Sequence, residues 1–241
     1  MKIAIYGDSI SEGIGKRKCN YVEPLLQLIS NNEKDIIIDN KAVTGTTVKY
    51  MAEKIDTEKY DWVIIGYGNV DAMLRPDLTH NPNLYSFLPN RYKQNGMLNP
   101  RPYFSNKWYK RMFQHFDSIF RWNINRLLLK IQGSTTWVSY ADFEATYKGC
   151  IEKLNKNGSQ LILLSTVKVK EKYFPGTNEM YKQFNDILKK FAQSYTNCHY
   201  VDLFNKLDKQ EYFYADGFHP NEKGYSLIAQ YIYEQIIFEK G

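Results

Sequence analysis

The sequence is poor in the residues from which disulfides and metal centres are built. Its three cysteines are odd in number, far apart and never arranged as C-x-x-C, so we expect free thiols at Cys19, Cys150 and Cys198. Only four histidines are present, and no spacing of Cys and His resembles a zinc site. We therefore expect a fold held together by neither disulfides nor a bound metal ion.

Long apolar runs are also missing from the sequence. The longest ones, such as Ile36–Ile38 and Leu161–Leu164, are far too short to cross a bilayer, so no integral membrane segment is expected. Met1 leads directly into Lys2–Tyr6, with no charged-then-apolar export segment ahead of it. On these grounds we expect a cytoplasmic protein.

The charge balance removes one class of partner and leaves others open. A net charge of +6 would suit nucleic acid, a membrane surface or an acidic small substrate. No basic run of the kind that binds nucleic acid is present, so nucleic acid is not an expected partner. At 241 residues, 43% of them hydrophobic, the chain can bury a substantial core but is cramped for two domains. We predict a single domain over residues 1–241.

Apolar, β-branched segments alternate along the chain with helical patterns, which is typical of a parallel sheet covered by helices on both faces. Five strands are predicted, at Lys2–Tyr6, Asp35–Asp39, Trp62–Tyr67, Gln160–Thr166 and His199–Leu203. Helices are predicted at Tyr21–Ser30, Val48–Glu53, Tyr140–Asn157, Asn178–Tyr195 and Glu222–Phe238. Ligands of such a sheet bind at the carboxyl ends of its strands. Functional side chains are therefore expected just after strands or in the loops beyond them.

Residues 72–133 form a stretch too long for a simple crossover between strands. It begins with a turn-rich part carrying Pro76, Pro82, Pro89, Pro100 and Pro102. A predicted helix follows, in which apolar residues recur every three or four positions: Trp108, Met112, Phe116, Phe120, Ile124, Leu127 and Ile131. We interpret the stretch as an insertion folded over the ligand-binding edge, as a lid or substrate wall.

The charge of this insertion is lopsided. Asp117 is the one acidic residue in the part that carries Arg101, Lys107, Lys110, Arg111, Arg121, Arg126 and Lys130. Two interpretations fit the pattern: a solvated helix face, or a basic rim that faces an acidic substrate or an anionic surface.

Ser9 is the first candidate for chemistry, because it follows the first predicted strand in the triplet Gly7-Asp8-Ser9. A serine hydroxyl becomes a nucleophile only with a partner base and a position open to substrate, such as a strand end. All three residues also suit a turn that merely caps the next helix. The triplet alone leaves both interpretations open.

A carboxylate and an imidazole stand three residues apart just ahead of the last predicted helix, as Asp216 and His219. Histidine can take a serine proton near neutral pH, and a carboxylate can fix the tautomer of the ring and stabilise its charged form. The alternative is a turn residue at 216 and an exposed histidine beside Pro220.

Gly45 and Asn69 follow the second and third predicted strands. Acyl transfer builds negative charge on the former carbonyl oxygen, and fixed donors aimed at that oxygen lower the barrier. The backbone N–H of a glycine can approach closely, and an asparagine offers a side-chain N–H. Both residues also suit ordinary turns.

In chain order, the four motifs are Gly7-Asp8-Ser9, Gly45, Asn69 and the pair Asp216 and His219. In this order they resemble the four sequence blocks of the SGNH (GDSL-like) hydrolases, a family of serine esterases. The resemblance implies a flavodoxin-like three-layer α/β/α sandwich with a five-stranded parallel sheet and a helical insertion after the third strand. It also implies that Ser9 is the nucleophile, that His219 is first the base and then the acid, and that Asp216 orients His219. The oxyanion hole implied by the family consists of the N–H groups of Ser9 and Gly45 and the amide of Asn69.

The sequence departs from the family pattern at two points. The first block reads Gly-Asp-Ser-Ile-Ser rather than Gly-Asp-Ser-Leu, and Val70 separates Asn69 from Asp71, where many members have Asp directly after Asn.

The activity implied is hydrolysis of a small acyl ester, with an O-acetyl group on a carbohydrate as the expected substrate, without a metal or organic cofactor. An O-acyltransferase that uses a sugar hydroxyl in place of water is an alternative, as is a non-catalytic module that binds carbohydrate or a partner. Nothing in the sequence requires a dimer.

Overall fold

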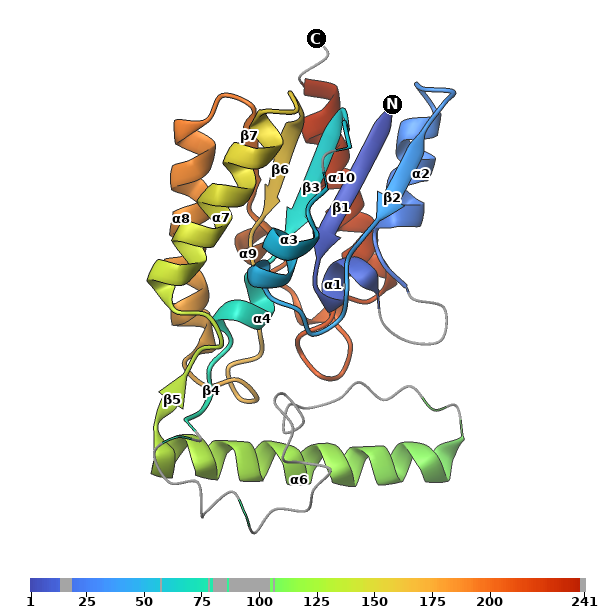
Figure 1. The fold of residues 1–241 in the computed structure, drawn as a ribbon. Helices are drawn as coiled ribbons and strands as arrows, with labels where there is room; N and C mark the ends of the chain where they lie inside the picture. Colours follow the sequence, from blue (N-terminus) through green and yellow to red (C-terminus); the bar gives the residue numbers. More distant parts are fainter. Residues whose placement is uncertain are drawn as a thin grey trace.

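A computed structural model describes residues 1–13, 19–56, 58–77, 79, 86, 105 and 107–238 (Figure 1). Its main sheet is parallel throughout, in the order β2-β1-β3-β6-β7. The strands are β1 (Lys2–Gly7), β2 (Ile37–Asn40), β3 (Trp62–Gly66), β6 (Gln160–Leu164) and β7 (Cys198–Val201). Numbered along the chain, the five strands stand in the order 2-1-3-4-5, which is the flavodoxin-like order. The predicted fold class is confirmed.

Helices cover both faces of the sheet (Figure 1). On one face α2 (Val22–Ser30) packs against α10 (Glu222–Phe238). On the other face α3 (Val48–Lys54) packs against α7 (Tyr140–Asn155), with α8 (Thr177–Ser194) beside α7 and β7. The structure therefore has the three layers that the sequence predicts.

Burial on both faces explains why the central strands are nearly continuous apolar runs. Every residue of β3 is buried, and only the first residue of β1 and of β6 is not. The edge strand β2 is more exposed, and its Ile37 is 60% accessible.

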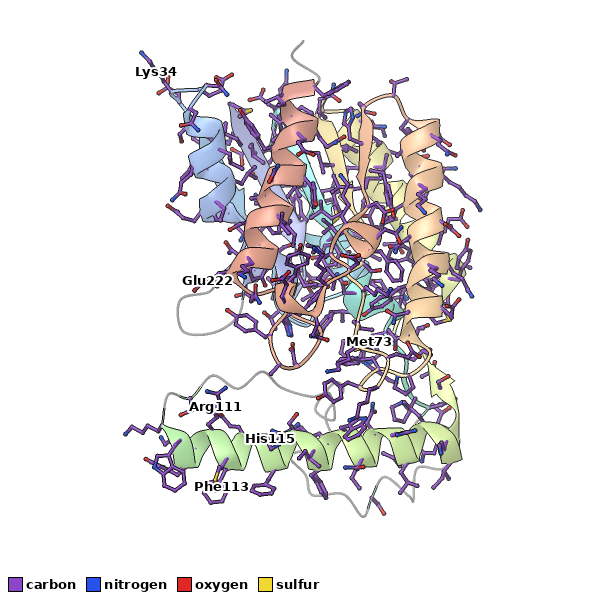
Figure 2. The ribbon with its side chains drawn as sticks, turned by 180° about the vertical axis from the view of Figure 1, so that it is seen from behind. Lys34, Met73, Arg111, Phe113, His115 and Glu222 are labelled. Carbon is purple, nitrogen blue, oxygen red and sulfur yellow. The ribbon has the colours of Figure 1, made fainter. Side chains whose placement is uncertain are left out.

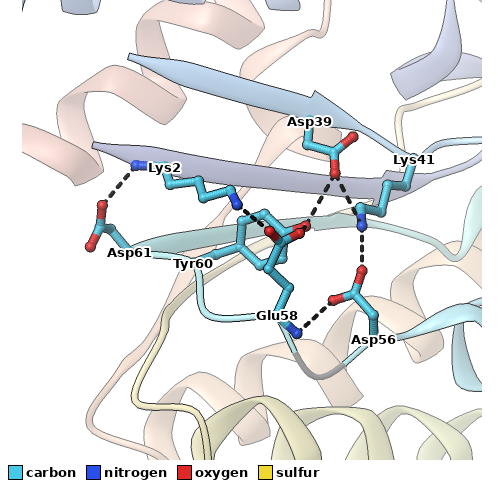
Figure 3. A network of polar contacts seen from close by, with 7 residues as sticks. All are labelled: Lys2, Asp39, Lys41, Asp56, Glu58, Tyr60 and Asp61. Carbon is cyan, nitrogen blue, oxygen red and sulfur yellow. Dashed lines mark hydrogen bonds and ion pairs between the residues drawn. The ribbon is translucent and has the colours of Figure 1, made fainter. Parts of the chain in front are cut away.

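A polar network ties the edge strand β2 to its neighbours (Figure 3). Lys41 forms ion pairs with Asp39, at 3.0 Å, and with Asp56. The hydroxyl of the buried Tyr60 donates to Asp39 at 3.1 Å and also contacts Glu58. The network joins β1, β2 and the loop that leads into β3. It therefore fixes the position of β2, from which the loop carrying Gly45 begins.

Two predicted strands end earlier than expected, because side chains take over the backbone N–H groups. Beyond β6 the N–H of Thr166 donates to the side chain of Asn185 at 2.9 Å instead of to a strand. After β7 the side chain of Asp202 caps a short helix, α9 (Leu203–Lys206). Strand β6 therefore ends before Thr166 and strand β7 before Leu203, the residues at which the two predicted strands end.

The predicted insertion helix is present as α6 (Trp108–Gln132), which lies across the carboxyl edge of the sheet (Figure 1). Its stem is a two-stranded antiparallel sheet of β4 (Arg75–Pro76) and β5 (Ser134–Thr135). The buried guanidinium of Arg75 lies 3.6 Å from the ring centre of Trp137. Most of the turn-rich part of the insertion, residues 80–85 and 87–104 with Arg101, lies outside the described residues.

Two expectations about absent features can be compared with the structure. Cys19, Cys150 and Cys198 are free thiols, as predicted. Across the described ranges, no helix combines the length and the apolar character needed to cross a membrane.

Candidate active site

Ser9 is the first residue of the short helix α1 (Ser9–Glu12), which begins two residues after β1 ends. Asp8 caps this helix, because its side chain accepts the N–H of Ile10 at 2.9 Å. Gly7 has no room for a side chain, since a Cβ there would lie 2.4 Å from Ser11 Oγ. The turn thus leaves Ser9 at the carboxyl edge of the sheet, where ligands of such folds bind.

Asp216 and His219 lie in the loop between the 3₁₀ turn Gln210–Tyr212 and α10. One carboxylate oxygen of Asp216 accepts the N–H groups of Phe218 and His219, each at 3.1 Å. The backbone of His219 is also fixed, because its carbonyl accepts the N–H of Tyr214 at 2.8 Å. This turn holds the imidazole over the carboxylate before any substrate is present.

The structure brings the three predicted side chains into one hydrogen-bonded chain. Ser9 Oγ lies 2.9 Å from His219 Nε2, although the two residues are 210 positions apart. His219 Nδ1 lies 2.6 Å from the second oxygen of Asp216. We assign the proton to Nδ1, because a carboxylate only accepts, and Nε2 then presents its lone pair to the serine hydroxyl. The catalytic roles of the three residues stay a prediction.

Asn69 begins the short helix α4 (Asn69–Ala72), three residues after β3 ends, and is 3% exposed. Its side-chain oxygen accepts the N–H of Val167 at 2.9 Å, and its carbonyl accepts the hydroxyl of Tyr181 at 2.8 Å. Because the oxygen accepts the N–H of Val167, the NH₂ group of the Asn69 side chain is directed away from Val167. Burial raises the pKa of the Asp8 carboxyl, and the nearby Asn69 side chain opposes part of this rise, so Asn69 lies beside the turn that carries Ser9.

Gly45 lies in the turn between β2 and α3 with a φ of +76°, a backbone conformation that favours glycine. The turn is tied to the Ser9 loop at two points. The N–H of Val43 donates to the carbonyl of Gly7 at 3.0 Å, and the N–H of Thr44 donates to the side chain of Glu12 at 2.6 Å. That the Gly45 N–H donates to an oxyanion stays a prediction.

Two buried carboxylates behind the site have functions that sequence reasoning missed. Asp71 accepts the N–H of Val48 at 2.8 Å and that of Gly68 at 2.9 Å, so it joins the loops that carry Gly45 and Asn69. Burial raises the pKa of Asp71 to about 7 and that of Asp8 to about 6. For Asp8 the available signal was an acid just after a predicted strand; Asp71, five residues beyond the end of β3, carried no such signal. Among the described residues, no group of three His, Cys, Asp or Glu side chains is placed to hold a metal ion.

The raised pKa of Asp71 predicts a characteristic pH dependence of stability. In the unfolded chain this carboxyl loses its proton near its ordinary pKa of 3.8, whereas in the fold it does so near 7. The unfolded state therefore gains stability as pH rises through this window, and the free energy of unfolding falls. The variant Asp71→Asn has no titrating group at this position. Relative to it, the free energy of unfolding of the wild type should fall by up to about 4 kcal/mol between pH 4 and pH 8. Urea unfolding of both proteins at several pH values measures this difference, and parallel curves would contradict the prediction.

A serine, a histidine and an aspartate joined in this way are the arrangement by which serine hydrolases transfer acyl groups. Comparison with known proteins agrees with that class. The model of the GDSL-like lipase/acylhydrolase family matches residues 5–227. The chain belongs to this family and is an ester hydrolase, which confirms the family resemblance seen in the sequence.

Solved structures of similar fold come from several sources. A lipase/acylhydrolase from Enterococcus faecalis is 18% identical, with a TM-score of 0.62 over 98% of this chain and 94% of that chain. A catalytic mutant of an acetylxylan esterase from Geobacillus stearothermophilus is 18% identical, with a TM-score of 0.60 over 98% and 93%. An α/β hydrolase from the metagenome of Lake Arreo, Spain, is 17% identical, with a TM-score of 0.60 over 96% and 92%. No curated protein matched the sequence significantly.

Proposed function

We propose that the protein hydrolyses a small acyl ester, namely an O-acetyl group on a carbohydrate, by two-step acyl transfer through Ser9. The observation that carries this proposal is the unbroken chain from Ser9 Oγ through His219 to Asp216, with contacts of 2.9 and 2.6 Å. A serine hydroxyl is a weak nucleophile by itself, and an adjacent imidazole oriented by a carboxylate is what activates it.

In the first step Ser9 Oγ attacks the ester carbonyl while His219 Nε2 takes the hydroxyl proton. The negative charge that develops on the carbonyl oxygen is stabilised by the N–H groups of Ser9 and Gly45 and by the amide of Asn69. Ser9 is suited to this role, because the first residue of a helix has no intrahelical acceptor for its N–H. His219 then gives its proton to the departing sugar oxygen, which leaves acetyl-Ser9. Water, deprotonated by His219, releases acetate and restores the serine.

The choice of a carbohydrate acetyl ester has separate support. The similar structure from Geobacillus stearothermophilus is named an acetylxylan esterase, although at 18% identity it carries only the fold. Helix α6 lies across the same edge of the sheet as Ser9 (Figure 1). We infer that it forms a lid or wall for the substrate. The ring centre of Trp122, on α6, lies 5.6 Å from that of Tyr173, in the loop after β6. The two rings meet edge to face.

Covalent labelling together with turnover tests the proposal. We expect the protein to hydrolyse 4-nitrophenyl acetate and to react with one equivalent of a fluorophosphonate, located by mass spectrometry on the peptide that contains Ser9. His219→Ala should lose both the turnover and the label. A protein that neither turns over the ester nor takes up the label would instead be the non-catalytic binding module.

The same acyl-enzyme distinguishes hydrolysis from acyl transfer. With an acetylated xylo-oligosaccharide as donor, we expect free acetate in equal yield with and without an excess of unacetylated saccharide. Acetyl groups that appear on the added saccharide at the expense of free acetate would identify an O-acyltransferase.

The oxyanion role of Asn69 predicts a fall of about 10²- to 10³-fold in kcat for Asn69→Ala, with little change in KM. Asn185→Ala is a matched control. Asn185 is also buried, and its side-chain oxygen accepts a neighbouring backbone N–H, that of Thr166, at the same distance of 2.9 Å. Both variants should lose similar thermal stability, but only Asn69→Ala should lose kcat. Equal effects of the two substitutions on kcat would assign Asn69 a purely structural role.

A further inference from the structure

Helix α6 is amphipathic in the reverse of the usual sense for a soluble domain. Its buried residues are mostly polar: Ser118, Arg121, Asn125, Leu128 and Gln132. Its large hydrophobic residues are mostly exposed, among them Trp108, Tyr109, Met112, Phe113, Phe116, Ile119, Leu127 and Ile131. A surface helix ordinarily turns its apolar stripe toward the core. Here the polar side meets the body of the protein, and the apolar side faces outward.

The exposed apolar residues form one continuous face. At the helical repeat of 3.6 residues they fall within an arc of about 140°, and the buried residues fall on a separate arc of about 80°. Figure 2 shows Phe113 on the side of α6 that points away from the sheet and Arg111 on the opposite side. The inner side is anchored, because Trp122 Nε1 donates to the carbonyl of Lys172 at 2.6 Å.

The charge of α6 narrows the choice of partner. The helix carries five basic residues and a single acid, Asp117. That acid is already paired with the buried Arg121, at 2.5 Å. The exposed bases are Lys110, Arg111, Arg126 and Lys130. By the helical repeat Arg126 and Lys130 lie within the exposed apolar arc, whereas Lys110 and Arg111 lie on the other side of the helix. The outer surface of the helix therefore combines aromatic and aliphatic side chains with the positive charge of Arg126 and Lys130.

We propose that the outer face of α6 binds the surface of a lipid bilayer that carries anionic headgroups. Apolar side chains rich in Trp and Phe on one face, with Lys and Arg around them, characterise helices that lie in the plane of the membrane interface. The long basic side chains can reach headgroup phosphates while the aromatic rings enter the acyl boundary. A second copy of the chain fits this face less well, because two such helices would bring like charges together.

In this orientation α6 lies parallel to the membrane, between the bilayer and the carboxyl edge of the sheet (Figure 1). The helix does not enter the bilayer core, since its five bases would have to be desolvated there. Binding at the surface is independent of ester hydrolysis, so it can be measured without a catalytic assay.

Vesicle sedimentation with the full chain tests the proposal. We expect binding to vesicles of equal parts phosphatidylcholine and phosphatidylglycerol to be about tenfold tighter or more than binding to pure phosphatidylcholine. Raising the salt concentration should weaken it, because salt screens the attraction to the headgroups. Binding that ignores both lipid charge and salt, or no binding to either vesicle, would overturn the proposal.

Variants separate this face from the rest of the surface. Phe113→Ser together with Phe116→Ser should weaken binding by about tenfold or more. The matched control, Ile237→Ser with Phe238→Ser, alters two exposed apolar residues at the end of α10 and should leave binding unchanged. For charge, Arg126→Gln with Lys130→Gln should weaken binding, whereas Lys148→Gln with Lys182→Gln, on α7 and α8, should not.

All four variants should keep the wild-type melting temperature to within a few degrees in circular dichroism, which verifies that they fold. If the phenylalanine variant and its control bind vesicles equally, the assignment of this face is wrong. A wild-type dimer in light scattering that the phenylalanine variant converts to a monomer, with no vesicle binding, would show that a second copy covers the face instead.

Discussion

Replacing Ser9 by alanine is expected to lower kcat for acetyl-ester hydrolysis by about 10⁴- to 10⁶-fold. The substitution deletes the oxygen that lies 2.9 Å from His219 Nε2 and leaves every other donor and acceptor of the site in place. The remaining groups can still bind the ester and polarise its carbonyl, so a small residual rate above that of water is expected. Because the serine side chain is small and buried, the fold should change little.

Ser11→Ala is the matched control for this variant. Ser11 lies on the same short helix, is buried, and accepts the hydroxyl of Tyr21 at 2.9 Å. Removing its oxygen leaves a buried tyrosine without that acceptor, so stability should fall by about 1 to 3 kcal/mol. Its kcat should stay within about tenfold of the wild type, since it touches neither His219 nor Asp216. Initial rates and thermal melts of both variants measure these effects, and wild-type turnover by Ser9→Ala would remove Ser9 from the nucleophilic role.

The sequence was sufficient to predict the central layer of the fold. Strands β1, β3 and β6 are buried on both faces, and such strands stand out as apolar runs whatever surrounds them. Helix α10 was predicted over the residues it occupies. The strand ends were less accessible, because they depend on acceptors far along the chain. Asn185 can accept the N–H of Thr166 only once α8 has packed against the sheet, where it contacts β7.

Periodicity predicted α6 but could not give the direction of its apolar face. A repeat of three or four residues shows that one side of a helix is apolar, and it is the same whether that side faces the core or the solvent. The contact that settles the matter is tertiary: Trp122 reaches the carbonyl of Lys172, fifty positions away. The two-residue strands β4 and β5 have no pattern of their own, since each exists only by pairing with the other.

The candidate site was predictable in its residue types and not in its support. Serine, aspartate and histidine could be selected because their chemistry is limited and their order resembles a known family. Asp71 appeared in the sequence only as a departure from the family spacing. Its function of joining two loops through the N–H groups of Val48 and Gly68 depends on full burial, which only the folded chain reveals.

Asp216→Asn is expected to lower kcat by about 10³- to 10⁴-fold while preserving the loop around it. One oxygen of Asp216 holds the N–H groups of Phe218 and His219, and the asparagine oxygen can continue to do so. The second oxygen, 2.6 Å from His219 Nδ1, is replaced by an NH₂ group, which only donates. The ring must then carry its proton on Nε2 and present an N–H to Ser9, and in that tautomer it cannot accept the hydroxyl proton.

Kinetics and stability together identify this effect. In the tautomer account kcat falls, KM stays near the wild-type value, and the melting temperature changes little. Asp202→Asn is the control: Asp202 caps α9 through the N–H of Asn205 at 3.2 Å and is not part of the chain from Ser9 to Asp216. It should melt slightly earlier and keep full activity. A wild-type kcat in Asp216→Asn would mean that Ser9 and His219 act as a pair, with the carboxylate needed only to shape the turn.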